Sequence, residues 1–216
     1  MKPFQHKIAV NHNYLSDSFL NLFANLNDNC YILSDKIYSV RKMRITEKIG
    51  YYYIRYFLNP LNAEKTINFT QSFNNAKTVF VIPPADYDKN KEKLALEEIE
   101  NIFPDREIRF YKPDNSILLC QNSNRCIYTS RFMQILKSPG IKNLSGLKTD
   151  ILIDLEQNFN LLTIFIAKSL SAPVKISFDK PFSKPFFNLR FKPAQSESFE
   201  NSLKEMCHFL QGFASG

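Results

Sequence analysis

The chain has 216 residues, of which 44% are hydrophobic and 23% are charged, and this length suits one α/β domain with an extension. It contains only 5 glycines and neither a G-x-G-x-x-G nor a G-x-x-x-x-G-K-[ST] motif, which counts against a glycine-rich phosphate loop. Its 4 cysteines form no C-x-x-C pair, and neither a signal peptide nor a run of 18 apolar residues is visible. We therefore expect a cytoplasmic protein with reduced thiols, no metal and no cofactor.

The net charge of +7 is concentrated in one segment of the chain. Between residues 36 and 55 there are 6 basic residues and one acidic residue, Glu47. A local basic block suits anionic lipid, nucleic acid or an acidic protein, and its structural alternative is a solvated face. The residues that we expect to bind such a surface are Arg41, Lys42, Arg44, Lys48 and Arg55.

Residues 1–75 show no regular alternation of strands and helices, and we interpret them as an N-terminal extension with amphipathic helices. Residues 16–26 predict a short helix, and residues 31–40 predict a pair of strands. From residue 41 a basic, aromatic helix is expected to run toward Pro60. Its expected apolar face is formed by Ile45, Ile49, Tyr52 or Tyr53, Tyr56 and Phe57. That face either packs on the rest of the protein or meets the headgroups of an anionic membrane, where tyrosine is well suited.

From residue 76 short apolar runs alternate with amphipathic stretches, which predicts βαβ units and a parallel sheet covered on both faces. Strands are expected in the ranges 77–82, 106–111, 116–121, 125–130, 149–155, 173–178 and 187–192. Helices are expected in the ranges 90–103, 130–138, 158–172 and 196–213, the second of which should stop at Pro139 and Gly140. The strand at 150–155 should be central, because its residues are apolar on both faces until Asp154.

The most specific pattern lies in residues 149–179, TDILIDLEQNFNLLTIFIAKSLSAPVKISFD. An aspartate precedes an apolar run and an Asp-Leu pair, and an apolar helix, a small-residue turn and a basic strand follow. In this order the chain resembles the lipopolysaccharide heptosyltransferases, glycosyltransferase family 9. The matching positions are Asp150, residues 151–153, Asp154, Leu155, Ser171, Ala172, Lys175, Ile176 and Phe178, while Ser177 stands where the family has a glycine.

The resemblance covers residues 76–216 and implies one Rossmann-like, three-layer α/β domain with a mostly parallel sheet, of the type found as the N-terminal half of the GT-B fold. In that family the sugar-nucleotide donor binds mainly to a second domain, which would begin near Gly216. The family also has a loop with Arg, Gly and Asp after its first strand, and that Asp is the proposed general base. Here the loop reads VIPPADYDKN, without glycine or arginine.

Three carboxylates are therefore the candidate site residues. Asp86 and Asp88 fall near the place of the family's base, and their structural alternative is to cap the helix that starts near Lys89. Asp154, at the carboxyl end of a parallel strand, either faces the ligand crevice or has a structural role, in which it caps the next helix or holds a loop amide.

Three functions agree with these observations. The first is a glycosyltransferase-like binding domain that is non-catalytic or depends on a partner, with a link to cell-envelope glycan or lipopolysaccharide synthesis. The second is an active glycosyltransferase completed by a partner chain or a homodimer. The third is a nucleic-acid-binding module that uses the basic block, although no RRM, KH or helix-turn-helix pattern is present. The expected partners are a protein that supplies a donor-binding domain and the anionic inner face of the membrane, with nucleic acid disfavoured.

Overall fold

The computed structural model describes residues 45–56, 67–112, 118–122, 125–128, 132–144, 146–194 and 198–214. For residues 87, 118–122, 125–128 and 142 it describes the backbone alone. The predicted helix at 16–26, the predicted strand pair at 31–40 and the basic residues Arg41, Lys42 and Arg44 lie outside the described residues. Residues 40–216 form one compact unit.

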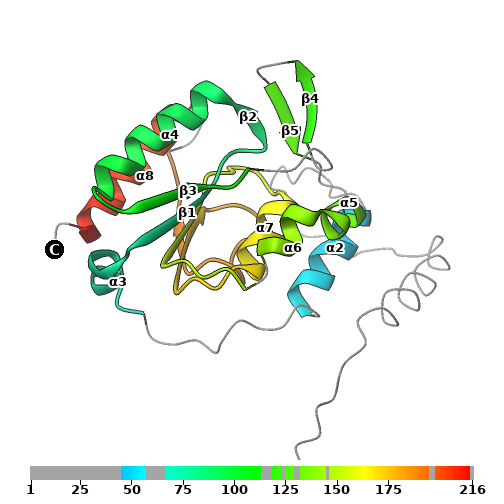
Figure 1. Ribbon diagram of the computed structural model, residues 1–216, viewed down its shortest axis with the longest axis horizontal. Helices are drawn as coiled ribbons and strands as arrows, with labels where there is room; N and C mark the ends of the chain where they lie inside the picture. Colours follow the sequence, from blue (N-terminus) through cyan, green and yellow to red (C-terminus); the bar gives the residue numbers. More distant parts are fainter. Residues whose placement is uncertain are drawn as a thin grey trace, which may run out of the picture. The chain divides into compact units, whose positions relative to one another are not determined.

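The centre of this unit is a five-stranded parallel sheet with the order β3-β1-β6-β7-β8 (Figure 1). The strands are β1 (Thr78–Ile82), β3 (Glu107–Phe110), β6 (Ile151–Asp154), β7 (Val174–Phe178) and β8 (Leu189–Phe191). β6 lies in the middle and all four of its residues are buried, as its apolar sequence predicts. The α/β class with a mostly parallel sheet is therefore confirmed.

Helices cover both faces of the sheet (Figure 1). Alternate residues of β1 point to opposite faces, so Phe80 and Ile82 join one apolar cluster while Val79 and Val81 join the other. The first cluster is closed by α2 (Ile45–Tyr56), α5 (Phe132–Lys137), α6 (Pro139–Leu144) and α7 (Leu161–Ser169). The second is closed by α3 (Phe69–Asn75), α4 (Lys89–Ile102) and α8 (Phe199–Ala214). The result is the three-layer arrangement expected from the sequence.

Two expected strands belong to a different sheet. Residues 116–121 and 125–130 were expected as the third and fourth strands along the α/β pattern, and they do contain β4 (Leu118–Asn122) and β5 (Arg125–Tyr128). These strands instead pair antiparallel in a small sheet of order β2-β5-β4, in which β2 is Asp86–Asp88. The two strands are separated by only two residues, 123 and 124, and a connection that short permits a hairpin but not a parallel crossover.

Of the expectations about helices, the stop near Pro139 was incomplete and the apolar face of α2 was wrong. The helix expected to stop at Pro139 does so, since α5 ends at Lys137, but Pro139 also begins a second helix, α6, that was not expected. Pro139 is the first residue of α6, a position where its missing N–H removes no intrahelical bond. In α2 the buried residues are Gly50, Tyr51 and Ile54, not the predicted face, because α2 packs against α7 where a glycine allows the two helices to approach. Ile45, Tyr52 and Tyr56 of the predicted apolar face are exposed.

Candidate functional site

The carboxyl ends of β1 and β6 meet where the order of the sheet reverses. β3 pairs with one edge of β1, and β6 pairs with the other. In doubly wound folds, ligands bind in the crevice outside the carboxyl ends of the strands at this point. Asp154 is the last residue of β6 and lies in register with Ile82 of β1 and Ser177 of β7. The predicted ligand residue therefore stands at the position in the sheet that such folds use.

The Asp154 carboxylate is paired with the ammonium group of Lys180, which follows β7. Lys180 Nζ lies 2.6 Å from Asp154 Oδ2, and both side chains are completely buried. The same ammonium group donates to the backbone carbonyl oxygen of Glu156 at 2.8 Å and lies 5.8 Å from the centre of the Phe187 ring. Asp154 Oδ1 accepts from the Glu156 amide at 3.0 Å. Both carboxylate oxygens of Asp154 are thus bound by groups of the same chain.

A second buried carboxylate, that of Glu156, joins the loops that follow β1 and β6. Its Oε2 accepts from the Ala85 amide at 2.6 Å, and its Oε1 accepts from the Asn158 amide at 2.8 Å. Ala85 follows Pro83 and Pro84, which have no N–H, so Ala85 supplies the first amide hydrogen after β1. The Glu156 side chain therefore fills the crevice between the two loops.

This crevice holds two carboxylates against one ammonium group. Burial raises the pKa of Glu156, and the Lys180 charge and the amides of Ala85 and Asn158 offset only part of that rise. Because the folded-state pKa is raised, the stability that Glu156 adds when protonated is fully present below its ordinary value of 4.5. That contribution is lost as the pH rises through the raised pKa, where the unfolded chain releases the proton more readily than the folded chain.

The loop after β7 holds the backbone at Lys180 in place. Ser183 Oγ donates to the Lys180 carbonyl oxygen at 2.7 Å. Phe182, between them, has a φ of 64°, in the left-handed region that an aromatic residue rarely adopts. Its ring lies 5.2 Å from that of Tyr51 and 5.6 Å from that of Phe159. Aromatic side chains from α2 and from the loop after β6 therefore shield this part of the site.

Asp86 and Asp88 have partners in α4 and not in the crevice. The Asp86 carboxylate lies 2.5 Å from Lys91 Nζ in a half-exposed ion pair. Asp88 is the N-cap residue of α4, and its Oδ1 accepts from the Asn90 amide at 2.9 Å. Asp88 thus has the capping role that was the alternative for both residues, whereas Asp86 forms an ion pair with the same helix. The contacts of these two carboxylates lie with α4 and not with the Asp154 network.

Of the predicted surface-binding residues, Lys48 and Arg55 are described, and both lie on α2. Arg55 is exposed, donates to the Tyr51 hydroxyl at 3.2 Å and lies 5.2 Å from the centre of the Tyr56 ring. Tyr56 in turn stacks on Tyr52 with ring centres 6.2 Å apart. These residues make an outward face of α2 that is both aromatic and basic.

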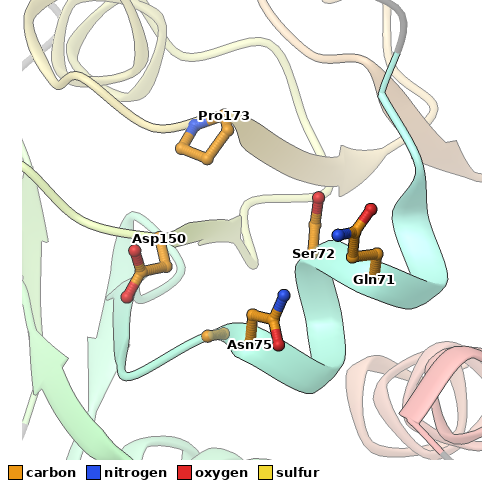
Figure 2. Close-up of a pocket in the computed structure, with 6 residues that line it drawn as sticks. Gln71, Ser72, Asn75, Asp150 and Pro173 are labelled. Atoms are coloured by element: carbon orange, nitrogen blue, oxygen red, sulfur yellow. The ribbon is translucent and has the colours of Figure 1, made fainter.

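A separate hollow of about 230 Å³ lies at the opposite, amino edge of the sheet. Figure 2 shows Asp150 and Pro173 on one side of it and Gln71, Ser72 and Asn75 of α3 on the other. Asp150 Oδ2 accepts from the amides of Lys77 and Thr78, at 2.8 and 2.9 Å, and from the Thr78 hydroxyl. Burial alone would raise the pKa of Asp150, but these hydrogen bonds outweigh it and the pKa is lowered. Asp150 therefore fastens the start of β1.

Sequence reasoning missed Glu156 and Lys180, which complete the buried network with Asp154. A signal for Glu156 was present, since an acidic residue directly follows a buried strand that already ends in Asp-Leu. Lys180 carries no local signal, because its partner lies 26 residues earlier in the chain.

Comparison with protein-family models, with curated proteins and with solved structures found no match to the chain. Within the described residues, no helix has the length and apolar character needed to cross a membrane. In the same part of the chain, no group of three or more His, Cys, Asp and Glu residues is arranged to hold a metal ion.

Proposed function

We propose that residues 76–216 act as a glycosyltransferase-like binding domain of the GT-B N-terminal type, linked to cell-envelope glycan synthesis and without turnover on their own. The resemblance of residues 149–179 to the heptosyltransferases supports the type of domain. The absence of turnover is inferred from the crevice between β1 and β6. This place is occupied by the carboxylate of Glu156 and the Asp154–Lys180 ion pair.

This filling disfavours tight binding of a sugar nucleotide. A diphosphate that entered the crevice would meet the buried Glu156 carboxylate, which already occupies the amides of Ala85 and Asn158, whereas doubly wound folds bind phosphate with free amides at such a place. The candidate bases also favour binding over catalysis, because Asp86 is engaged with Lys91 and Asp88 caps a helix. A partner chain would supply the donor half if the complete reaction takes place.

Isothermal titration calorimetry of the wild-type chain with UDP-, GDP- and ADP-sugars tests the absence of donor binding. We expect no binding tighter than about 100 μM, or roughly −5.5 kcal/mol. A lipopolysaccharide inner-core oligosaccharide, added as the acceptor-side probe, should give saturable heat without turnover.

Tighter binding of any sugar nucleotide would contradict the proposal and favour the active transferase. Transfer assays of the Asp86→Asn and Asp88→Asn variants then locate the chemistry, since asparagine has the shape of aspartate and at residue 88 can still cap α4. A chain that binds neither class of probe would contradict the binding role itself.

We also propose that the outward face of α2 meets an anionic membrane surface. Ile45, Tyr52 and Tyr56 are 71%, 55% and 63% exposed, while Tyr51 and Ile54 of the same helix are buried and fasten it to the domain. Tyrosine suits the headgroup region, and each basic residue near an anionic leaflet contributes about 1 kcal/mol. Arg55 over Tyr56 places a charge beside these rings.

Sedimentation with vesicles that contain anionic lipid tests this second role. We expect co-sedimentation at low salt that falls as salt rises, and falls further in the Lys48→Glu/Arg55→Glu variant. The matched control is Lys93→Glu/Lys204→Glu, which makes the same change of charge on exposed positions of α4 and α8. If the wild-type chain stays in the supernatant at low salt, the face is structural.

A further inference from the structure

The crevice between β1 and β6 has the parts of an anion site. Two backbone amides, of Ala85 and Asn158, converge on one pair of oxygens, and the buried Lys180 ammonium group binds the adjoining backbone carbonyl and Asp154. Backbone N–H groups that point at one place bind phosphate and other anions in many proteins. Here the two oxygens belong to the Glu156 side chain.

We propose that this crevice is a binding site for an external carboxylate or phosphate group, and that the Glu156 carboxylate is its displaceable internal occupant. The inference goes beyond the proposed function, which assigns no ligand to the crevice in its closed state. Displacement would open the site that is closed in this structure, so Glu156 acts as an internal competitor of the ligand.

The charge balance of the network identifies Glu156 as the group that can leave. Asp154 is fully buried and is bound directly to Lys180, so its removal would leave that ammonium group buried and unpaired. Glu156 is the second carboxylate beside a single ammonium group, and burial disfavours its charge. When its side chain leaves, the Asp154–Lys180 pair remains neutral and two amides are free to bind another anion.

The amino edge of the same sheet provides a matched control. Asp150 also receives two backbone amides, from Lys77 and Thr78, through one side-chain oxygen. Asp150 is half-buried, whereas Glu156 is only 5% exposed, so water can more easily replace the Asp150 carboxylate. Removal of Asp150 and removal of Glu156 therefore differ in the burial of the lost carboxylate and in the presence of the buried Lys180 ammonium group.

The experiment measures the thermal unfolding midpoint of four full-length proteins during titration with acetate, inorganic phosphate or chloride at equal ionic strength. Glu156→Ala should show a saturable rise of about 3 °C or more with acetate, phosphate or both, because a ligand that binds only the folded state stabilises it. Wild type, Glu156→Gln and Asp150→Ala should show only the small, unsaturated response that chloride also gives. Glu156→Gln keeps the volume of the side chain in the crevice and so leaves no room for the anion.

A response to acetate alone assigns the site to carboxylates, and a response to phosphate alone assigns it to phosphate groups. Equal responses of Glu156→Ala and Asp150→Ala, or no response of Glu156→Ala to either anion, would overturn the inference. If Glu156→Ala stays unfolded in buffer, refolding from urea is measured in the same salts. Refolding in acetate or phosphate but not in chloride supports the site, and failure in all three overturns it.

The outcome is separable from that of the proposed function. Tight binding of sugar nucleotides by the wild-type chain would refute the proposed function and leave the rescue of Glu156→Ala unaffected. Failure of that rescue would make Glu156 a structural link between two loops while the calorimetric result stands.

Discussion

At the scale of single residues, the buried Lys180 ammonium group offsets the cost of burying the Asp154 carboxylate. Its Nζ is the one positive charge within hydrogen-bonding distance of the Asp154 carboxylate in the described part of the chain. Removing one partner of a buried pair leaves an uncompensated charge and typically costs about 3–5 kcal/mol. We therefore expect Lys180→Met to lower the free energy of unfolding by about that amount, measured by urea denaturation.

Two comparisons make this expectation specific to the buried charge. Asp154→Asn/Lys180→Met should be more stable than Lys180→Met alone, because one unpaired carboxylate is gone. Lys204→Met removes a lysine from an exposed pair with Glu200 and should leave the stability nearly unchanged. A loss no larger for Lys180→Met than for Lys204→Met would show that the network adds little to stability.

At the scale of elements, the packing of α2 on α7 depends on Gly50. A Cβ at this position would lie 2.5 Å from Leu161 Cδ2 and 3.0 Å from the Phe132 ring, and Leu161 is fully buried. Gly50→Ala gains about 1 kcal/mol of helix propensity but must displace a packed core, which costs about 1–3 kcal/mol. We expect a net loss of stability of about 1 kcal/mol by urea denaturation.

The second helical glycine gives the opposite expectation. Gly212 of α8 has no atom within 4 Å of its would-be Cβ, so Gly212→Ala should stabilise the protein by about 0.5 kcal/mol. If both variants stabilise, Leu161 and Phe132 move aside at little cost and the close approach of the helices is not essential.

The ends of α7 are fixed by side chains at both termini. Asn160 Oδ1 accepts from the Leu162 amide at 2.9 Å, and Lys175 Nζ donates to the carbonyl oxygens of Ala167 and Leu170. Burial, and the charge of Lys168 to a lesser degree, lower the pKa of Lys175 to about 8. The basic residue that helps to define the sequence pattern at 149–179 is thus a helix cap in the structure.

At the scale of the whole molecule, the sequence was sufficient for the layers but not for the site. Buried parallel strands such as residues 151–154 are apolar on both faces, and this property is visible in one short window. The sequences of β4 and β5 resemble those of strands in the parallel sheet. Only their pairing in the structure shows that they belong to the separate sheet with β2. The buried face of α2 was predicted wrongly because the pattern of apolar residues gives no weight to glycine. In the structure Gly50 is buried, and the lack of a side chain there lets α2 approach Leu161 closely.

The crevice could be predicted only in part, for a related reason. Asp154 was visible as a charge at the end of an apolar strand, but its partner Lys180 reads as an ordinary surface lysine. Both residues are buried because the pairing of β6 with β7 brings the loop after β7 beside the end of β6. This pairing joins residues that are far apart in the chain, so a short window of sequence does not reveal it.

The same sheet order has a consequence for how the protein folds. β1 and β6 are neighbours in the sheet, although Thr78 and Asp150 are 72 residues apart, and contacts of such high sequence separation form slowly because loop closure costs entropy. During synthesis, Asp154 and Glu156 leave the ribosome before Lys180, so an emerging chain holds both acids without their cation. We therefore expect the acids to remain hydrated until the lysine arrives, and the pairing of β6 with β7 to be the step that buries Asp154.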